Sequence, residues 1–180
     1  MNKKKLISES YIELVVKANT TNVKVSDICE RACVSRKTFY YYFKDKQDII
    51  EHIFCEEIEK TMINGLKYEI DEKTQAIITY REFLRHKDFF IIAMKDDGQN
   101  SLFEIIIDRC TKFCRETFDQ YFNDKVKLDY LSYKYASTSA MLLKKWMNSG
   151  MKESPEFLAE VYLSTIQDIY LEKIKVTKHK

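Results

Sequence analysis

Proline and glycine are scarce in this chain of 180 residues, which holds one Pro and three Gly. Sheet proteins and loop-rich proteins need more of these turn-forming residues, so the scarcity favours a mostly helical fold. It also leaves no Gly-rich loop to cradle a nucleotide phosphate, and we find no nucleophile elbow and no paired His–carboxylate motif. We therefore expect no enzyme activity, no catalytic residues and no cofactor.

Long apolar runs are also absent, since no stretch of about 18 apolar residues occurs and no transmembrane helix is expected. The basic start at Lys3, Lys4 and Lys5 is not followed by an apolar stretch with a cleavage site, so no signal peptide is expected. Five scattered cysteines, an odd number, indicate reduced thiols in a cytoplasmic protein without a membrane partner. Zinc and other metals are not expected, because the histidines lack ligand spacing: His52, His86 and His179.

Charge is distributed unevenly along the chain. Residues 1–50 hold ten Lys or Arg against six Asp or Glu, whereas residues 51–180 hold twenty against twenty-two. The first fifty residues therefore suit a polyanion, although many solvated helical domains have a similar excess. The run Lys3–Lys5 fits a solvated tail, or an arm that reaches phosphate or the minor groove.

Apolar periodicity predicts a succession of helices and no strand. The second half of the chain divides into separate helices at Gly98 and Gly150, and Ser154–Pro155 is a typical helix start. The expected helices cover residues 6–18, 25–32, 35–42, 45–66, 73–86, 88–95, 100–122, 128–149 and 155–173.

Two of these helices, residues 25–32 and 35–42, are short and are separated only by a brief break at Cys33 and Val34. Such a pair, supported by a third helix, can place its second helix in the major groove of DNA. Here Ser35 can cap the second helix. Basic and hydroxyl side chains occupy its first turn, where a recognition helix meets bases and phosphates: Arg36, Lys37 and Thr38.

Three consecutive tyrosines, Tyr40, Tyr41 and Tyr42, follow in the same helix. They fan over about 200° of the helical wheel and cannot all be buried. If Phe39 and Phe43 face the core, at least two tyrosines face outward. Exposed tyrosines beside basic residues can pack on thymine methyl groups and donate to phosphates.

The stretch VSDICERACVSRKTFYYYFKDKQDIIEHIF resembles the N-terminal signature of the TetR family of transcription regulators. The order and spacing of about eleven positions agree: Val25, Ile28, Ala32, Val34, Ser35, Thr38, Phe39, Tyr40, Phe43, Lys46 and Ile49. The chain departs from the pattern at Cys33, where Gly is usual, and at Lys24, where a capping Thr is common. A left-handed Cys costs roughly 1 kcal/mol, so either a shifted turn or slight strain at Cys33 is expected.

The resemblance implies a set of DNA-contacting residues. Arg36 and Lys37 match positions that approach base edges, and Tyr40 and Tyr41 match positions that pack against bases or backbone. Thr38, Tyr42 and Lys46 match positions that usually touch phosphate. The DNA-binding set is completed by Lys24, whose charge could still reach phosphate, and by the capping Ser35.

The second half resembles, less specifically, the ligand-binding and dimerising domain of a branch found in Gram-positive bacteria. That branch includes regulators of dihydroxyacetone kinase operons. The matching segments are Phe89–Phe90, Gly98, Ser101–Phe103, Trp146, Gly150–Met151 and Ser154–Pro155.

We therefore expect an all-α protein with a three-helix DNA-binding domain at residues 1–50 and an effector-binding, dimerising bundle at 51–180. The two last helices are expected to pair with their copies in a C2 homodimer that binds a pseudo-palindromic operator in double-stranded DNA. The interface residues would be Tyr135, Ser139, Leu143, Trp146, Leu158, Tyr162 and Ile166, with core packing the alternative for Trp146.

An unknown small-molecule effector is expected to bind between the helices of the bundle. Its pocket would be lined by apolar side chains, each of which could equally be plain core: Tyr80, Phe83, Phe90, Met94, Phe103 and Phe113. Two cysteine pairs have a spacing of four, Cys29/Cys33 and Cys110/Cys114, which would allow a thiol switch or a metal site. Core packing of Cys29, Cys110 and Cys114, with Cys33 as the turn residue, fits them better.

The sequence thus predicts a ligand-responsive transcription regulator, and a repressor is the default because most relatives repress. Three alternatives stay open: a co-activator with the same fold, a helical ligand-binding protein or enzyme without a DNA function, and an adaptor with a vestigial helix-turn-helix.

Overall fold

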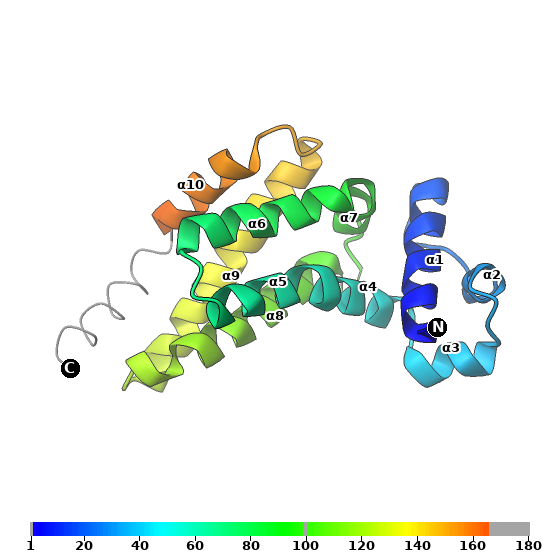
Figure 1. Ribbon diagram of the computed structural model, residues 1–180, viewed down its shortest axis with the longest axis horizontal. Helices are drawn as coiled ribbons and strands as arrows, with labels where there is room; N and C mark the ends of the chain where they lie inside the picture. Colours follow the sequence, from blue (N-terminus) through cyan, green and yellow to red (C-terminus); the bar gives the residue numbers. More distant parts are fainter. Residues whose placement is uncertain (1, 99–100, 166–180) are drawn as a thin grey trace.

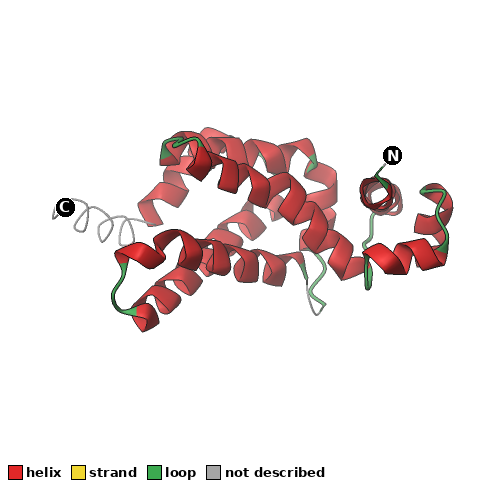
Figure 2. Ribbon diagram, turned by 60° about the horizontal axis from the view of Figure 1, so that its bottom comes forward, coloured by secondary structure: helices red, strands yellow, loops and turns green. Residues whose placement is uncertain are grey.

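The structure is a computed structural model that describes residues 2–98 and 101–165, and all regular elements within these ranges are helical (Figure 1). Figure 2 shows the same arrangement from another side, without a strand among the described residues. The predicted all-α fold is therefore confirmed. The α-helices are α1 (Lys3–Ala18), α2 (Val25–Arg31), α3 (Arg36–Tyr42), α4 (Lys46–Phe54), α5 (Lys60–Lys67), α6 (Glu72–Arg85), α7 (Lys87–Met94), α8 (Leu102–Phe118), α9 (Lys125–Asn148) and α10 (Pro155–Thr165).

Helices α1, α2 and α3 form a unit at one end of the molecule (Figure 1). Their shared core consists of fully buried apolar side chains, which come from every helix of the unit and from the start of α4. These are Ile7, Tyr11, Val15, Ile28, Phe39, Phe43 and Ile49. Because α2 and α3, with seven residues each, are too short to be stable alone, this burial holds α3 in place.

One rod runs from Lys46 to Lys67 and joins this unit to the rest of the molecule. The sequence predicted a single helix at residues 45–66, and the rod matches it closely. Its middle, Cys55–Glu59, is a π-helical turn, and the backbone on both sides of that turn stays right-handed and helical. The N-terminus of the rod is capped by Asp45, whose carboxylate accepts a hydrogen bond from the Asp48 amide at 2.9 Å.

The remaining helices form a bundle around this rod. Helices α8 and α9 pack against each other along their length, and α10 packs on α6 (Figure 1). The main core continues from the N-terminal unit into the bundle, and a second cluster is formed at its far end by Phe118, Phe122, Leu128 and Tyr135. None of the helices in residues 2–98 and 101–165 is long and apolar enough to cross a membrane.

Several predicted boundaries shift. The predicted helix at 100–122 ends as an α-helix at Phe118, and a 3-10 turn, Asp119–Tyr121, follows. Helix α9 begins three residues earlier than predicted, because the Asp124 carboxylate caps it by accepting from the Lys127 amide at 2.9 Å. The last part of the predicted helix 155–173 lies outside the described residues. The predicted domain boundary after residue 50 falls inside α4 and stays a prediction.

The residues predicted for the dimer interface need correction, because most of them face the interior of one subunit. The exposed fractions of Tyr135, Trp146 and Leu158 are only 2–3%, and that of Leu143 is 6%. For Trp146 the alternative of core packing is confirmed, and its indole N–H donates to the Glu153 carbonyl at 3.0 Å. The half-buried Ser139 and Tyr162 line an internal pocket together with Tyr135 and Leu143, and Ile166 lies outside the described residues.

Candidate nucleic-acid interface and ligand pocket

Helix α3 is fixed on the surface by its two ends and its inner face. The Ser35 hydroxyl caps it by accepting from the Thr38 amide at 3.1 Å, and the Ser35 and Thr38 hydroxyl oxygens are 3.0 Å apart. The side chains of Phe39 and Phe43 are 0% and 1% exposed, as the sequence predicted. Arg36 and Lys37 are exposed in the first turn, so the helix presents its basic end to solvent.

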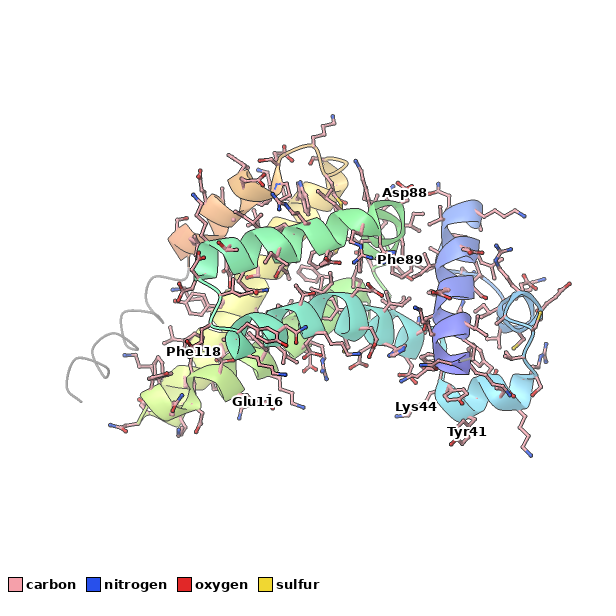
Figure 3. The ribbon with its side chains drawn as sticks, viewed as in Figure 1. Tyr41, Lys44, Asp88, Phe89, Glu116 and Phe118 are labelled. Atoms are coloured by element: carbon pink, nitrogen blue, oxygen red, sulfur yellow. The ribbon has the colours of Figure 1, made fainter. Side chains whose placement is uncertain are left out.

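The three tyrosines divide as expected, with two exposed and one packed. The exposed fractions of Tyr40 and Tyr41 are 58% and 80%, and Figure 3 shows Tyr41 on the outer side of α3. Tyr42 is half-buried against the core, and its ring meets that of Tyr41 edge-on at 4.8 Å between centroids. Lys44, which the sequence analysis did not select, is also exposed beside Tyr41 (Figure 3).

The turn between α2 and α3 contains Cys33 with φ = 51°, in the left-handed region. The Val34 amide donates to the Cys29 carbonyl at 2.9 Å, and the Cys33 amide donates to the Glu30 carbonyl at 3.1 Å. These two bonds form a Schellman motif, in which glycine usually occupies the position of Cys33. The expected left-handed cysteine is therefore present, and its thiol is exposed.

Lys24 and Lys46, two of the residues predicted to contact phosphate, differ in their exposure and in their hydrogen bonds. Lys24 is exposed at the N-cap of α2 and makes no side-chain cap, as its departure from Thr implied. Lys46 is half-buried, and its Nζ donates to Asn22 Oδ1 at 3.0 Å. Lys46 thus ties the start of the rod to the loop that precedes α2.

The N-terminal unit is also attached to the loop after α7. The Thr21 hydroxyl donates to Asp96 Oδ2 at 2.6 Å, and the Gly98 amide donates to Asp96 Oδ1 at 3.1 Å. These bonds, that of Thr21 first, hold the pKa of the Asp96 carboxyl below its usual value. The ring of Tyr11 packs edge-on against that of Phe89, with centroids 6.1 Å apart. The position of the unit on the bundle is therefore specified by both polar and aromatic contacts.

Arg109 of α8 holds the connecting rod from the other side. Its Nη2 lies 2.5 Å from Glu59 Oε2 in the π-turn, and its Nη1 lies 3.8 Å from Glu51 Oε1 in α4. Hydrogen bonding to Glu59 is the main cause that raises the pKa of Arg109. Because the Arg109 and Glu59 side chains are only 25% and 12% exposed, water screens this pair weakly.

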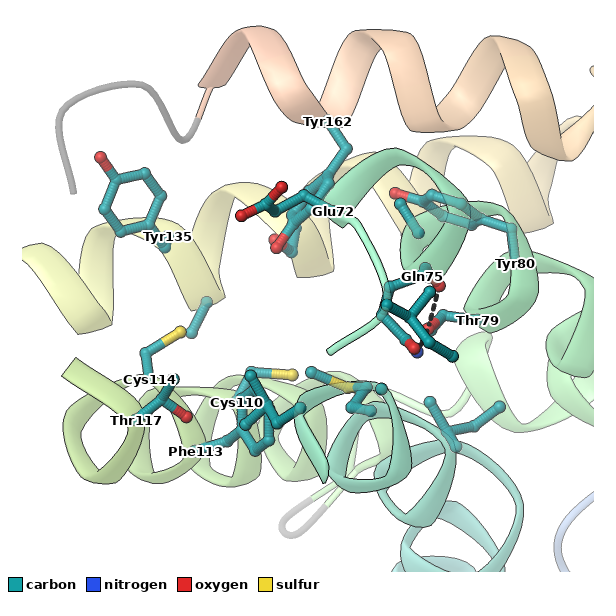
Figure 4. A pocket seen from close by; sticks show the side chains of 18 of the residues that line it. Glu72, Gln75, Thr79, Tyr80, Cys110, Phe113, Cys114, Thr117, Tyr135 and Tyr162 are labelled. Carbon is teal, nitrogen blue, oxygen red and sulfur yellow. Dashed lines mark hydrogen bonds between the residues drawn. The ribbon is translucent and has the colours of Figure 1, made fainter. Parts of the chain in front are cut away.

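A pocket of about 720 Å³ lies between the rod and helices α6, α8, α9 and α10 (Figure 4). Its volume falls within the range of small-molecule sites, roughly 300–1,000 Å³. Most of its wall is apolar. These side chains include Phe54, Ile58, Met62, Phe83, Ile106, Phe113, Phe118 and Leu143.

Helix α6 contributes several polar groups to this wall. The Gln75 amide group donates to the Thr61 carbonyl at 3.0 Å and to the Thr79 hydroxyl at 3.2 Å, whereas Gln75 Oε1 is buried and accepts no hydrogen bond. Gly65 makes room for this oxygen, since a Cβ there would lie 1.8 Å from it. Tyr80 is 5% exposed, and Figure 4 shows its hydroxyl directed into the pocket.

The thiols in and near the pocket are not activated. Burial raises the pKa of Cys114 to about 12, and burial also raises the pKa of Cys110 strongly. Burial, followed by the hydrogen bond to Glu59, raises the pKa of Cys55 in the π-turn to about 12. A thiol that stays protonated is a poor nucleophile and a poor metal ligand, so these cysteines act as small packing groups. In the part of the chain that the structure covers, no group of His, Cys, Asp and Glu is arranged to hold a metal ion.

Three of the six residues predicted to line the pocket do line it, and three do not. Tyr80, Phe83 and Phe113 line the cavity, but Phe90, Met94 and Phe103 do not. Phe90 and Met94 are wholly buried because α7 fills the space between α1 and the bundle. Phe103 lies half-buried under the Lys144 ammonium, 4.9 Å from its ring centroid.

Several lining residues were missed by the sequence analysis, including Gln75, Thr79 and Cys114. The polar pair Gln75 and Thr79, four residues apart on the inner side of α6, is the only local signal that could have indicated them. The other lining residues have the ordinary appearance of core.

Comparisons with known proteins agree with this geometry. Residues 12–53 match the family profile described as bacterial regulatory proteins of the tetR family, and residues 68–168 match that of a transcriptional regulator C-terminal region. The chain is similar to an uncharacterized HTH-type transcriptional regulator, YuxN, of Bacillus subtilis (strain 168), with 23% identity over 184 residues that cover 93% of this chain. The match spans 62% of that relative's length.

Among solved structures, the fold is similar to that of the dihydroxyacetone kinase operon activator DhaS. The TM-score is 0.64, the sequence identity is 17%, and the match covers 97% of each chain. This likeness concerns the fold. The resemblance first drawn from residues 25–54 is confirmed by the profiles, which together cover most of the sequence, and the chain belongs to the TetR family of bacterial transcription regulators.

Proposed function

We propose that this chain is a ligand-responsive repressor that acts in the cytoplasm as a homodimer on a pseudo-palindromic operator. The observation that carries this proposal is the exposed face of α3, where Arg36, Lys37, Tyr40 and Tyr41 project from a capped and buttressed helix. A C2 dimer would place two such helices about 34–36 Å apart, which is the spacing of successive major grooves.

Exposed apolar side chains on the outer side of the bundle supply a surface for the second subunit. On α9 they recur at helical spacing, with exposed fractions of 68% for Val126, 74% for Tyr130, 58% for Tyr133 and 60% for Met141. Phe157 on α10 is 54% exposed. These residues replace the buried ones in our proposal for the interface, because they are the ones that a partner would remove from water.

The rod from Lys46 to Lys67 offers a route from ligand to DNA. Its first half starts directly after α3, and its second half supplies Ile58 and Met62 to the pocket wall. A ligand that displaces the second half would tilt the first half and change the spacing of the recognition helices. Such coupling needs only about 1–3 kcal/mol.

A mobility-shift assay with the DNA upstream of the gene tests the proposal. We expect Tyr41→Ala and Arg36→Ala each to weaken operator affinity by about 1–3 kcal/mol, because their side chains would meet bases or backbone. Binding should also weaken steeply as salt rises, since phosphate contacts release counterions.

Two exposed residues far from α3 provide matched controls, Tyr68→Ala and Arg85→Ala, and these should leave affinity unchanged. Unaltered operator binding by both α3 variants would refute the contact assignment. A promoter–reporter strain lacking the regulator decides the direction of control, since loss of a repressor raises reporter output and loss of a co-activator lowers it.

A further inference from the structure

The charge around the pocket is one-sided. Three acidic residues line it, Glu69, Asp71 and Glu72, and no Lys, Arg or His of the described chain does. All three are exposed, and they occupy the segment between α5 and α6 and the first residue of α6. The carboxylates therefore form an acidic rim at the edge of a cavity whose interior is mainly apolar.

The lysines nearest to the rim in the sequence, Lys67 and Lys73, interact with other groups. Lys73 donates to Glu160 of α10 at 3.3 Å, and the Lys67 ammonium lies over the Tyr68 ring, 5.4 Å from its centroid. Within residues 2–98 and 101–165, no ion pair involves any of the three carboxylates of the rim. The rim thus keeps its negative potential facing whatever enters the pocket.

The interior holds a second signal for a ligand. The Gln75 side chain belongs to the pocket wall, and its Oε1 is buried and accepts no hydrogen bond from the described residues. A buried amide oxygen without a donor costs free energy, and a positively charged group placed beside it would recover part of that cost. Tyr80 and Glu72 lie on the same helix eight residues apart, which corresponds to about 12 Å along its axis.

We propose that the effector is an elongated apolar cation, with an amine or quaternary ammonium group at the acidic rim and an apolar body that reaches toward Tyr80. This inference specifies the ligand of the pocket that the proposed function assigns to the effector. An anion of the same shape would bring a like charge to the rim and lose its own hydration, so the pocket should bind it more weakly than the cation.

The single tryptophan provides a direct measurement without DNA. The Trp146 ring lies 5.6 Å from the Tyr80 ring between centroids, so a molecule that reaches Tyr80 changes the tryptophan fluorescence. Three probes of equal chain length are titrated below their micellar concentrations: decyltrimethylammonium, decan-1-ol and decanoate. We expect the cation to bind about tenfold or more tightly than decanoate, with the alcohol between them.

A triple variant tests the origin of this preference. Glu69→Gln, Asp71→Asn and Glu72→Gln together remove the charge of the rim and keep an N-cap at residue 71, so the cation should lose its advantage. A matched triple variant on exposed residues outside the pocket, Asp88→Asn, Asp108→Asn and Glu116→Gln, should retain it (Figure 3 labels two of these).

Three outcomes would overturn the proposal: decanoate binding as tightly as the cation, equal loss of preference in both triple variants, or no fluorescence response and no calorimetric heat with any probe. Because no DNA is present, the two proposals fail separately. If the chain binds the cation but no operator, the proposed ligand is supported and the proposed regulator function is refuted. If it binds an operator but shows no preference for the cation, the regulator function is supported and the proposed ligand is refuted.

Discussion

Helix α3 of the N-terminal unit and the pocket of the bundle place tyrosine side chains in opposite ways. In the unit, phenylalanines fill the core and Tyr40 and Tyr41 project outward, with 58% and 80% of their surface exposed. In the bundle, Tyr80, Tyr135 and Tyr162 turn inward and line a cavity. A surface that must fit one constant partner, B-form DNA, has a fixed pattern of residue types, whereas a cavity wall only needs side chains that leave space between them.

The largest expected difference between the two regions is in the cost of removing an aromatic ring. Phe39→Ala should lower the free energy of unfolding by about 3–5 kcal/mol, because the ring is 0% exposed in a filled core. Phe113→Ala should cost only about 1 kcal/mol, because that half-buried ring already borders empty space. Urea unfolding followed by circular dichroism measures both, and equal losses would contradict the contrast.

A smaller effect is expected where the bundle holds the rod. Arg109→Ala should destabilise the fold by about 1–3 kcal/mol, because it leaves the weakly exposed Glu59 carboxylate without its charged partner. The control is Arg115→Ala, whose partner Asp129 lies 3.2 Å away but whose ion pair is 55–59% exposed, and which should cost about 0–1 kcal/mol. If thermal unfolding shows similar shifts in melting temperature for the two variants, the Arg109–Glu59 ion pair contributes no more to stability than a surface ion pair.

The smallest effect should be a gain. Cys33→Gly is expected to stabilise the protein by about 0.5–1 kcal/mol, because glycine adopts the left-handed conformation of the turn without strain. Gly150 occupies the corresponding position after α9, with φ = 82°, so Gly150→Ala should lose about 1 kcal/mol. Chemical denaturation that found Cys33→Gly neutral or harmful would show that the thiol has packing contacts that outweigh the strain.

The sequence predicted the helix-turn-helix to the level of single residues because two constraints act on α3. Phe39 and Phe43, four residues apart, identify its buried face, and the basic first turn identifies the opposite one. The capping Ser35 then sets where the helix begins. Local pattern alone was enough for this part of the candidate site.

In the bundle, the same reasoning predicted where the helices lie in the sequence but not which of their faces are buried. Helix α9 has apolar residues on two sides, and periodicity could not decide whether Tyr135 and Leu143 or Tyr130 and Met141 faced the interior. The cavity was harder still, because it is formed where side chains from several helices fail to meet. No single segment contains that information, and the apolar run of α7, which gave Phe90 and Met94 as lining residues, is simply core.

The π-turn at Cys55–Glu59 has a consequence for the phase of the rod. One extra residue in a helical turn rotates all later side chains by about 100° relative to an uninterrupted α-helix. The isoleucines before it are buried in the core next to α1 and α8, and Met62 after it reaches the cavity. Without the inserted residue, Met62 would turn away from the cavity while the isoleucines kept their places, so the length of this segment, as much as its composition, sets which later side chains line the pocket.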